Sequence, residues 1–388
     1  MDTHDNINVV TETQFFDYPP ELLPFKTQRG ETLAELRLAY EMYGELNATG
    51  DNAILIFHAL TGSQHAMGFT ESVEGVSLWS DECQTGWYSG TVGPGLAIDT
   101  DKFAVIVVNY LGGCYGTTGP GSLDPITGSP YGSTSPEITL SDIVDSQIPL
   151  LDALGIERLH AVIGASVGGM MCLSLATRYP DRVSTVIPIS AGLRTTPLQF
   201  IHNFEQTTAI LNDPKFKGGD YYDTEPPNDG LALARMIGHK TFVSLDAMAD
   251  RASRTTITGS GPAGYEIRHP LESYIWYQGQ KFLQRFDANT YVRLMGAWQH
   301  FDLLEEAGES DLRTQLSRCR EQTYMVFSVD SDVCFYPSEQ EEMVRELTAA
   351  GVSARRVTVH SEKGHDSFLV EPELFAPHLI DTLEQTKR

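Results

Sequence analysis

A serine in a tight glycine-rich turn is the residue of this chain best suited to nucleophilic chemistry. Ser166 is the central residue of Gly164–Gly168, a G-x-S-x-G pattern that follows the apolar run 159–163 and precedes a helical pattern. A serine on a turn from strand to helix projects its hydroxyl out of the sheet, where amides at the helix start favour a developing oxyanion. The alternative is a serine that caps an ordinary helix. The flanking patterns favour the nucleophile.

A nucleophilic serine needs a general base and an acid that orients the base. In α/β-hydrolases the chain order is serine, acid, histidine. Asp330 and Asp332 both follow the apolar run 324–327, and His365 lies beside a glycine after the last predicted strand. The sequence therefore predicts His365 as the base, while spacing alone leaves Asp330 and Asp332 as rival acids.

Histidines elsewhere fit the role of the base less well. His58 and His65 precede the serine, which is the wrong order for this fold. His160 lies within a predicted strand, and we expect it to be a core residue.

A tetrahedral oxyanion needs two backbone N–H donors. One expected donor is the amide of Val167, directly after the serine. The other should come from the loop 58–63, which follows the apolar run 53–57, and we predict the amide of Leu60. The alternative is that this loop is a simple turn.

The apolar runs that must position these residues are short and rich in β-branched side chains, as in a parallel sheet with helices on both faces. Between two of them, residues 139–154 show helical periodicity, with Thr139 and Asp142 spaced as a capping box and Gly155 as a stop. This alternation predicts an α/β fold with a mostly parallel sheet. The predicted strands are 53–57, 104–108, 159–163, 185–189, 324–327 and 356–360.

The alternation of strands and helices stops between residues 193 and 314. Helical stretches and loops rich in Gly, Pro and Asp fill this part of the chain. We therefore expect a catalytic core of residues 1–192 and 315–388, interrupted by a helical lid of residues 193–314. Such a lid could form a narrow passage over Ser166 and keep water from the reaction.

The composition of the chain argues against several classes of protein. The 388 residues include 52 acidic and 27 basic side chains, a net charge of −25, which disfavours binding to nucleic acid or anionic lipid. The five cysteines are widely spaced and form no C-x-x-C, so neither a disulfide framework nor a metal site is expected. The N-terminus has no basic segment followed by an apolar one, so we expect a cytoplasmic protein.

These segments resemble the homoserine O-acetyltransferases, a family of the α/β-hydrolase superfamily. The similarity is dispersed over roughly residues 30–370, which makes it far more specific than the serine turn alone. The matching segments are HALTGSQHAMG at 58–68, GWYSGTVGPGLAIDTDKF at 86–103, NYLGGCYGTTGP at 109–120, DPITGSPYG at 124–132, LLDALGIERLHAVIGASVGGM at 150–170, ALARMIGHKTFVS at 232–244, YQGQKFLQRFDANTY at 277–291, SDVCFYPSEQ at 331–340 and GHDSFL at 364–369.

The resemblance implies transfer of an acetyl group from acetyl-CoA to the side-chain hydroxyl of L-homoserine, through an acetyl-serine in a ping-pong mechanism, as in methionine biosynthesis. It implies acetyl-CoA as a co-substrate without any bound cofactor, and a homodimer. Ser166, Asp332 and His365 stand at the family's nucleophile, acid and base. Within 331–340 the acid precedes the tail F-x-P-S-E-Q, which favours Asp332 over Asp330.

The resemblance also implies two residues that bind the acceptor. Arg235 matches an arginine that binds the carboxylate of the amino acid, and Asp366 matches an acid that can hold its ammonium group. The chemistry agrees, because a guanidinium can bind a carboxylate with two parallel hydrogen bonds. The alternatives are a helix-surface salt bridge for Arg235 and a loop cap for Asp366.

Several positions depart from the usual family pattern, which leaves the acceptor and the acyl donor open. One alternative is a related acyltransferase with L-serine or deacetylcephalosporin C as acceptor, or succinyl-CoA as donor. A second is an ester hydrolase of the same fold. The intact candidate triad argues against a binding protein without catalysis. The departures are Ala165, Val167, Met171, Cys172, Ser174, Leu175, Thr207, Thr208, Phe242, Trp298 and Gln299.

Overall fold

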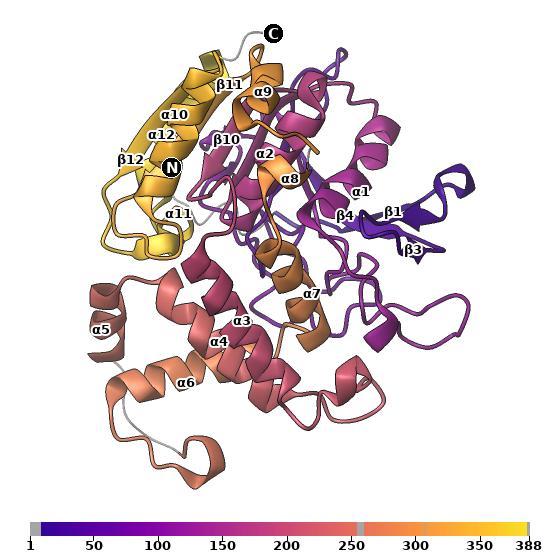
Figure 1. The fold of residues 1–388 in the computed structure, drawn as a ribbon, viewed down its shortest axis with the longest axis vertical. Helices are drawn as coiled ribbons and strands as arrows, with labels where there is room; N and C mark the ends of the chain where they lie inside the picture. Colours follow the sequence, from indigo (N-terminus) through magenta and orange to yellow (C-terminus); the bar gives the residue numbers. More distant parts are fainter. Residues whose placement is uncertain (1–8, 254–259, 307, 386–388) are drawn as a thin grey trace.

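The centre of the molecule is an eight-stranded sheet in the order β1-β4-β8-β5-β9-β10-β11-β12 (Figure 1). The computed structural model describes residues 9–253, 260–306 and 308–385. Strand β4 pairs antiparallel with β1 and β8, and every pair from β8 to β12 is parallel. The strands are β1 (Gln14–Asp17), β4 (Arg37–Tyr43), β5 (Ala53–Phe57), β8 (Ala104–Val108), β9 (Leu159–Ala165), β10 (Val183–Ile189), β11 (Thr323–Val329) and β12 (Ser353–Val359). The predicted α/β-hydrolase fold with a mostly parallel sheet is confirmed.

Both faces of the sheet are covered, because alternate strand residues point to opposite sides. On β9, Val162 packs into the core shared with α1 (Leu140–Ala153), α2 (Val167–Arg178) and α10 (Pro337–Ala349). Its neighbours Ala161 and Ile163 pack on the other side, where α12 (Pro372–Gln385) lies. Burial on both faces explains why the central strands read as continuous apolar runs.

The predicted helix 139–154 is present as α1, and its capping box is formed. The Thr139 side chain accepts from the backbone N–H of Asp142, and the Asp142 side chain accepts from that of Thr139. The helix is followed by Gly155 with φ +74°, a left-handed conformation that favours glycine.

The antiparallel strands β1 and β4 were not predicted. In β4 the charged residue Glu41 lies in the middle of the strand, buried with 1% of its surface exposed. A charged residue interrupts the apolar pattern from which a strand is recognised.

Helices fill the chain between β10 and β11, and Figure 1 shows α3, α4, α5 and α6 grouped below the sheet. Helices α3 and α4 pack together, α4 and α6 pack together, and α3 contacts α7, whereas the short α8 and α9 contact the core helices α2 and α10. The division of the chain at residues 193 and 314 stays a prediction. The helices are α3 (Pro197–Leu211), α4 (Asn228–Phe242), α5 (Leu245–Ser253), α6 (Pro270–Phe282), α7 (Ala288–Gln299), α8 (Leu303–Glu306) and α9 (Leu312–Leu316).

Two general features follow from the described part of the chain. No helix in it has the length and apolar character needed to cross a membrane. The five cysteines are free thiols, and three of them are buried.

Candidate active site

Ser166 lies on a sharp turn between β9 and α2, where close backbone contacts require glycine on both sides. The serine itself has φ +60° and ψ −127°, a conformation rare for residues with a side chain. A Cβ atom on Gly164 would lie closer than 3.0 Å to the Gly168 backbone, and one on Gly168 would come as close to the Phe57 carbonyl oxygen. The G-x-S-x-G pattern therefore follows from the packing of β9, α2 and the neighbouring β5.

His365 is paired with Asp332 in a buried hydrogen bond. The histidine lies on the short helical turn η8 (Gly364–Asp366) after β12, and its Nδ1 atom is 2.7 Å from Oδ2 of Asp332. The other carboxylate oxygen accepts from the backbone N–H groups of Cys334 (2.8 Å) and Phe335 (2.9 Å), which fixes its orientation. Burial lowers the pKa of His365, but the negative charge and hydrogen bond of Asp332 outweigh it, so the pKa is raised overall.

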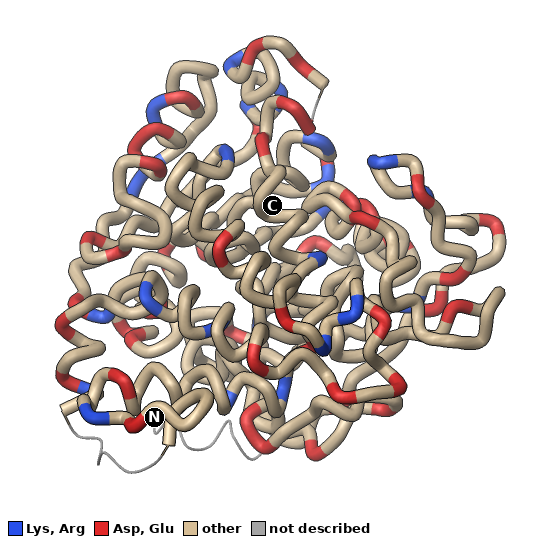
Figure 2. Tube along the Cα trace, turned by 60° about the horizontal axis from the view of Figure 1, so that its bottom comes forward, with Lys and Arg blue, Asp and Glu red and all other residues tan. Residues whose placement is uncertain are grey.

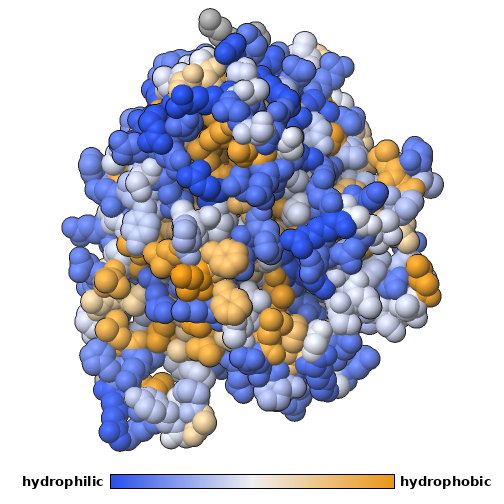
Figure 3. All heavy atoms as spheres, in the orientation of Figure 1, coloured by the Kyte–Doolittle hydropathy of each residue, from blue (hydrophilic) through white to orange (hydrophobic). Residues whose placement is uncertain are grey.

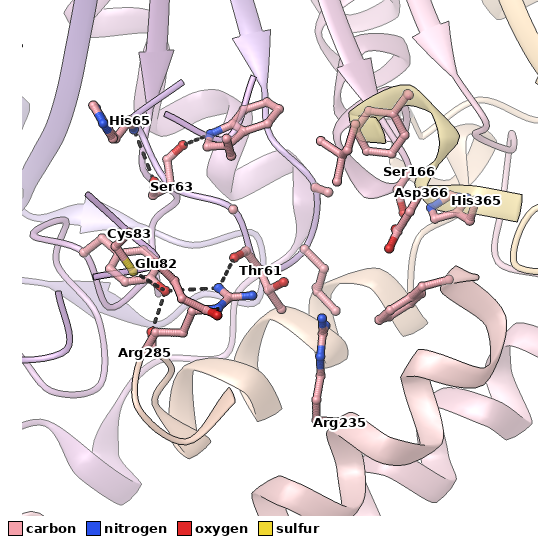
Figure 4. Close-up of a pocket in the computed structure, with 18 of the residues that line it drawn as sticks. Thr61, Ser63, His65, Glu82, Cys83, Ser166, Arg235, Arg285, His365 and Asp366 are labelled. Atoms are coloured by element: carbon pink, nitrogen blue, oxygen red, sulfur yellow. Dashed lines mark hydrogen bonds and ion pairs between the residues drawn. The ribbon is translucent and has the colours of Figure 1, made fainter. Parts of the chain in front are cut away.

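The second ring nitrogen of His365, Nε2, is not used by the pair with Asp332. With Nδ1 donating to Asp332, Nε2 carries the lone pair, and this buried atom has no hydrogen-bond partner among the described residues. Figure 4 places Ser166 beside His365, and both line one cavity. Nε2 is thus available to take the serine proton.

The two rival acids occupy different places. Asp330 accepts from Nδ1 of His360 at 2.8 Å, and this pair is solvent-exposed. Asp332 is 2% exposed and lies behind His365. Of the two acids, the geometry therefore associates Asp332, and not Asp330, with His365.

The cavity has a volume of about 450 Å³ and brings together most of the predicted site residues. Ser166, His365, Arg235, Asp366 and Leu60 all line it. Val167, the predicted oxyanion donor after the serine, is the first residue of α2, and its side chain is buried in the core.

Arg235 enters the cavity from α4 as an isolated cation (Figure 4). Its guanidinium lies over the rings of Phe242 and Phe282, 5.2 and 4.9 Å from their centroids. Within the described ranges, no carboxylate lies at ion-pair distance from it, which argues against the surface salt bridge considered above. Burial, with the repulsion of Arg285, lowers its pKa to about 10, so it remains charged at neutral pH.

Asp366 supplies the opposite charge at the same cavity. Burial raises the pKa of this carboxyl, while the positive charges of His365 and Arg235 oppose that shift. Its side chain makes no capping hydrogen bond to α11 (Ser367–Val370), so the alternative of a loop cap is not what the structure shows. A cation and an anion thus face the space beside Ser166, as a zwitterionic amino acid requires.

The sequence reasoning missed a charged cluster on the opposite wall of the cavity. Lys281 and Arg285 both form ion pairs with Glu82, and Nη1 of Arg285 donates to the Thr61 carbonyl at 3.0 Å. All four residues line the cavity. Lys281 lies in the last turn of α6, and Arg285 lies in the turn that follows the helix, so no local sequence pattern links these cations to Glu82.

The loop 58–63 does contain a tight turn at the cavity wall. The N–H of Gly62 donates to the Ala59 carbonyl at 2.9 Å, which places Leu60 and Thr61 at the tip. A side chain on Gly62 would approach the His58 side chain to 2.8 Å, so the turn depends on this glycine. The backbone of Leu60 is therefore held at the edge of the cavity that contains Ser166.

Comparisons with known proteins identify the family of the chain. A family model described as alpha/beta hydrolase fold matches residues 52–372. The chain is 42% identical to a homoserine O-succinyltransferase of Aromatoleum aromaticum, over 90% of each chain. It is 40% identical to a homoserine O-acetyltransferase of Moorella thermoacetica, over 95% of this chain and 94% of the relative.

Solved structures share the fold of this chain. A homoserine O-acetyltransferase from Bacillus anthracis superposes with a TM-score of 0.86 at 26% identity, covering 97% of this chain and 99% of that one. Esterase E22 superposes with a TM-score of 0.84, also at 26% identity, covering 96% of this chain and 100% of that one. The relatives share one fold and differ in the named acyl group or acceptor. The chain therefore belongs to the homoserine O-acyltransferase family of enzymes with the α/β-hydrolase fold.

Proposed function

We propose that this enzyme transfers an acetyl group from acetyl-CoA to the hydroxyl of L-homoserine through an acetyl-Ser166 intermediate. The observation that carries the proposal is the single cavity in which Ser166 and His365 lie with a cation, Arg235, that has no ion-pair partner among the described residues, and with a partly buried anion, Asp366. A nucleophile with its base explains acyl transfer, and the opposite charges explain an amino-acid acceptor.

In the first half-reaction the Ser166 oxygen attacks the thioester carbonyl while Nε2 of His365 takes the serine proton. The amides of Val167 and Leu60 donate to the oxyanion. The carbon–sulfur bond then breaks, and His365 returns the proton to the leaving thiolate, which leaves acetyl-Ser166 and free CoA. Asp332 keeps the imidazole oriented and stabilises its protonated form.

In the second half-reaction homoserine binds with its carboxylate on Arg235 and its ammonium group near Asp366. His365 takes the proton of the side-chain hydroxyl, whose oxygen attacks the acetyl carbonyl. The bond to Ser166 breaks, the serine regains its proton from His365, and O-acetylhomoserine leaves. The helices α4, α6 and α7 contribute Arg235, Lys281 and Trp298 to the wall of the cavity, and this enclosure limits the access of water.

A succinyl donor is the second candidate, and the cluster of Lys281 and Arg285 favours it. These two cations share one carboxylate, Glu82, and so carry excess positive charge that a distal carboxylate of the acyl group could meet. The names of the relatives are divided between acetyl and succinyl transfer.

The release of thiol by the purified enzyme decides among these reactions. We expect rapid CoA release from acetyl-CoA only when homoserine is present, and much slower release with L-serine. Faster release from succinyl-CoA than from acetyl-CoA would establish the second candidate. Equal release with and without acceptor would show an ester hydrolase, as the name of esterase E22 describes for that protein.

A homodimer that assembles through α3 and α4 is part of the proposal. Apolar side chains are exposed along α3, and Figure 3 shows them gathered on the face over α3, α4 and α6. Such a patch on a soluble enzyme marks an interaction surface, and self-association with a second copy is what the resemblance implies. The exposed residues are Leu198, Phe200, Ile201, Phe204, Leu211, Leu233 and Tyr277. The mass of the enzyme in solution, measured by light scattering, tests the homodimer.

We further propose that the enzyme acts in the cytoplasm, in methionine biosynthesis.

A further inference from the structure

A histidine and a glutamate that the mechanism does not use form a fully buried pair beneath the cavity. His65 and Glu41 are 0% and 1% exposed in their side chains, and Nδ1 of His65 is 3.0 Å from Oε2 of Glu41. Glu41 belongs to β4, whereas His65 belongs to the loop that follows β5 and itself lines the cavity. Two ionisable groups without access to water are costly unless they are paired and fully hydrogen-bonded.

The surrounding hydrogen bonds show where hydrogens lie on His65 and around Glu41. Nε2 of His65 is 3.0 Å from the Gln84 carbonyl, which can only accept, so Nε2 carries a hydrogen. Glu41 accepts from the hydroxyls of Thr13 (2.9 Å) and Tyr43 (2.8 Å). A hydrogen bond between Nδ1 and Oε2 therefore needs one further proton, which joins the two side chains.

The pair is connected to the loop 58–67, which we call the oxyanion loop because it contains the Leu60 amide assigned to the oxyanion. Glu41 reaches this loop twice, directly through His65 and indirectly through Tyr43. The Tyr43 oxygen accepts from the N–H of Ala66 at 2.7 Å, and its own proton goes to Glu41. A carboxylate on β4 thus fixes both a side chain and a backbone amide at the end of the loop.

Other anchors hold the oxyanion loop but lack this connection. The Tyr110 hydroxyl donates to the His58 carbonyl, Arg285 donates to that of Thr61, and Nε1 of Trp87 donates to that of Ser63 at 2.9 Å. Each of these contacts is one hydrogen bond to one carbonyl. The Glu41–His65 pair is the only one of these anchors in the described chain that combines charge, burial and a second link to the backbone.

We propose that Glu41 and His65 are positioning residues that hold the oxyanion loop, and through it the Leu60 amide, in register with the reacting carbonyl. This inference rests on the proposed acyl transfer. Positioning of this kind acts on the transition state, because displacing a catalytic group by about 1 Å can lower the rate about a hundredfold. The binding of the acceptor should not change, because Arg235 and Asp366 lie on other elements.

The test compares Glu41→Gln and Tyr43→Phe with the wild-type enzyme, using 4-nitrophenyl acetate and the full reaction. The ester value of kcat/KM reports formation of the acyl-enzyme. We expect Glu41→Gln to lower it by about ten- to a hundredfold, with a smaller loss for Tyr43→Phe, while the KM for homoserine stays within about twofold of wild type. Tyr43→Phe removes one hydroxyl only and keeps the test available if Glu41→Gln does not fold.

The matched control is Glu306→Gln. Glu306 is a partly buried carboxyl, it accepts from the Ser174 hydroxyl at 2.9 Å, and it does not line the cavity. We expect the same ester kcat/KM as for wild type. Variants at Glu41 and Tyr43 that are folded and as fast as wild type would overturn the inference and leave the proposed function intact. A wild-type enzyme that releases no nitrophenolate would overturn the acyl-enzyme route, and this inference with it.

Discussion

At the scale of single residues, the proposed chemistry depends on two opposite charges, Arg235 and Asp366, that are partly buried in the cavity beside Ser166. Arg235 has aromatic rings instead of a carboxylate around it, and Asp366 makes no capping bond. Partial burial makes both charges costly. The proposed zwitterionic acceptor would relieve that cost in a way that water or a neutral alcohol cannot, so we expect these two residues to link binding to acceptor identity.

Replacing Arg235 by alanine should impair the acceptor step alone. Removing one partner of a buried charge pair costs about 2–5 kcal/mol, so we expect the homoserine KM to rise at least tenfold while the KM for acetyl-CoA changes little. Steady-state kinetics with each substrate varied in turn provide the measurement. Lys240→Ala is the control, because Lys240 is an exposed cation on the same helix. An unchanged homoserine KM in Arg235→Ala would remove this residue from the acceptor site.

The pH dependence should report the pairing of His365 with Asp332. The base must be neutral to accept a proton, so activity is lost as the pH falls through the pKa of His365. Because Asp332 raises this pKa above the ordinary value of 6.5, with Asp366 and Glu339 contributing in the same direction, the acidic limb should lie above that value. In Asp332→Asn the limb should move to lower pH and kcat should fall steeply. A profile of kcat/KM that does not move would contradict this pairing.

At the scale of elements, the site depends on a backbone crossing that leaves no room for side chains. The turn between β9 and α2 packs against the end of β5, so Gly164 and Gly168 have no space for a Cβ atom. This contact brings the oxyanion loop, which follows β5, next to the turn that carries Ser166. The strained serine and the Leu60 amide, the proposed second oxyanion donor, are therefore positioned by the same packing.

Adding a methyl group at this crossing should unfold or strongly destabilise the enzyme. For Gly168→Ala we expect a loss of several kcal/mol, since the new Cβ atom meets backbone that cannot give way. Thermal unfolding gives the measurement. Gly296→Ala on α7 is the matched control, because no atom lies within 4 Å of its Cβ position, and its melting temperature should equal or exceed that of wild type. Equal stability of both variants would show that the crossing is not tight.

The elements that could be predicted from the sequence are those whose pattern follows from burial alone. The central strands and α1 were found because apolar runs and a capping box are local signals. Strand β4 was missed because Glu41 is paired with a histidine that lies far away in the sequence. The wall formed by Lys281, Arg285 and Glu82 was missed for the same reason, since the partners come together only in the folded chain.

At the scale of the whole molecule, the surface and the site carry opposite charges. Acidic residues outnumber basic ones, 52 to 27, and Figure 2 shows both kinds spread along the chain trace. The proposed acyl donor, acetyl-CoA, is itself an anion, so we expect the overall field to oppose its approach. Two cations on the cavity wall, Lys281 and Arg285, provide local attraction instead. Recognition of the donor should therefore depend on these few residues.

The central claim is that Ser166 carries the acyl group between donor and acceptor, and mass spectrometry of the enzyme tests it most directly. We expect incubation with acetyl-CoA alone to leave an acetyl group on the peptide that contains Ser166, and we expect homoserine to discharge it as O-acetylhomoserine. Ser166→Ala should show neither the adduct nor turnover. An adduct on another residue, or full turnover by Ser166→Ala, would contradict the account.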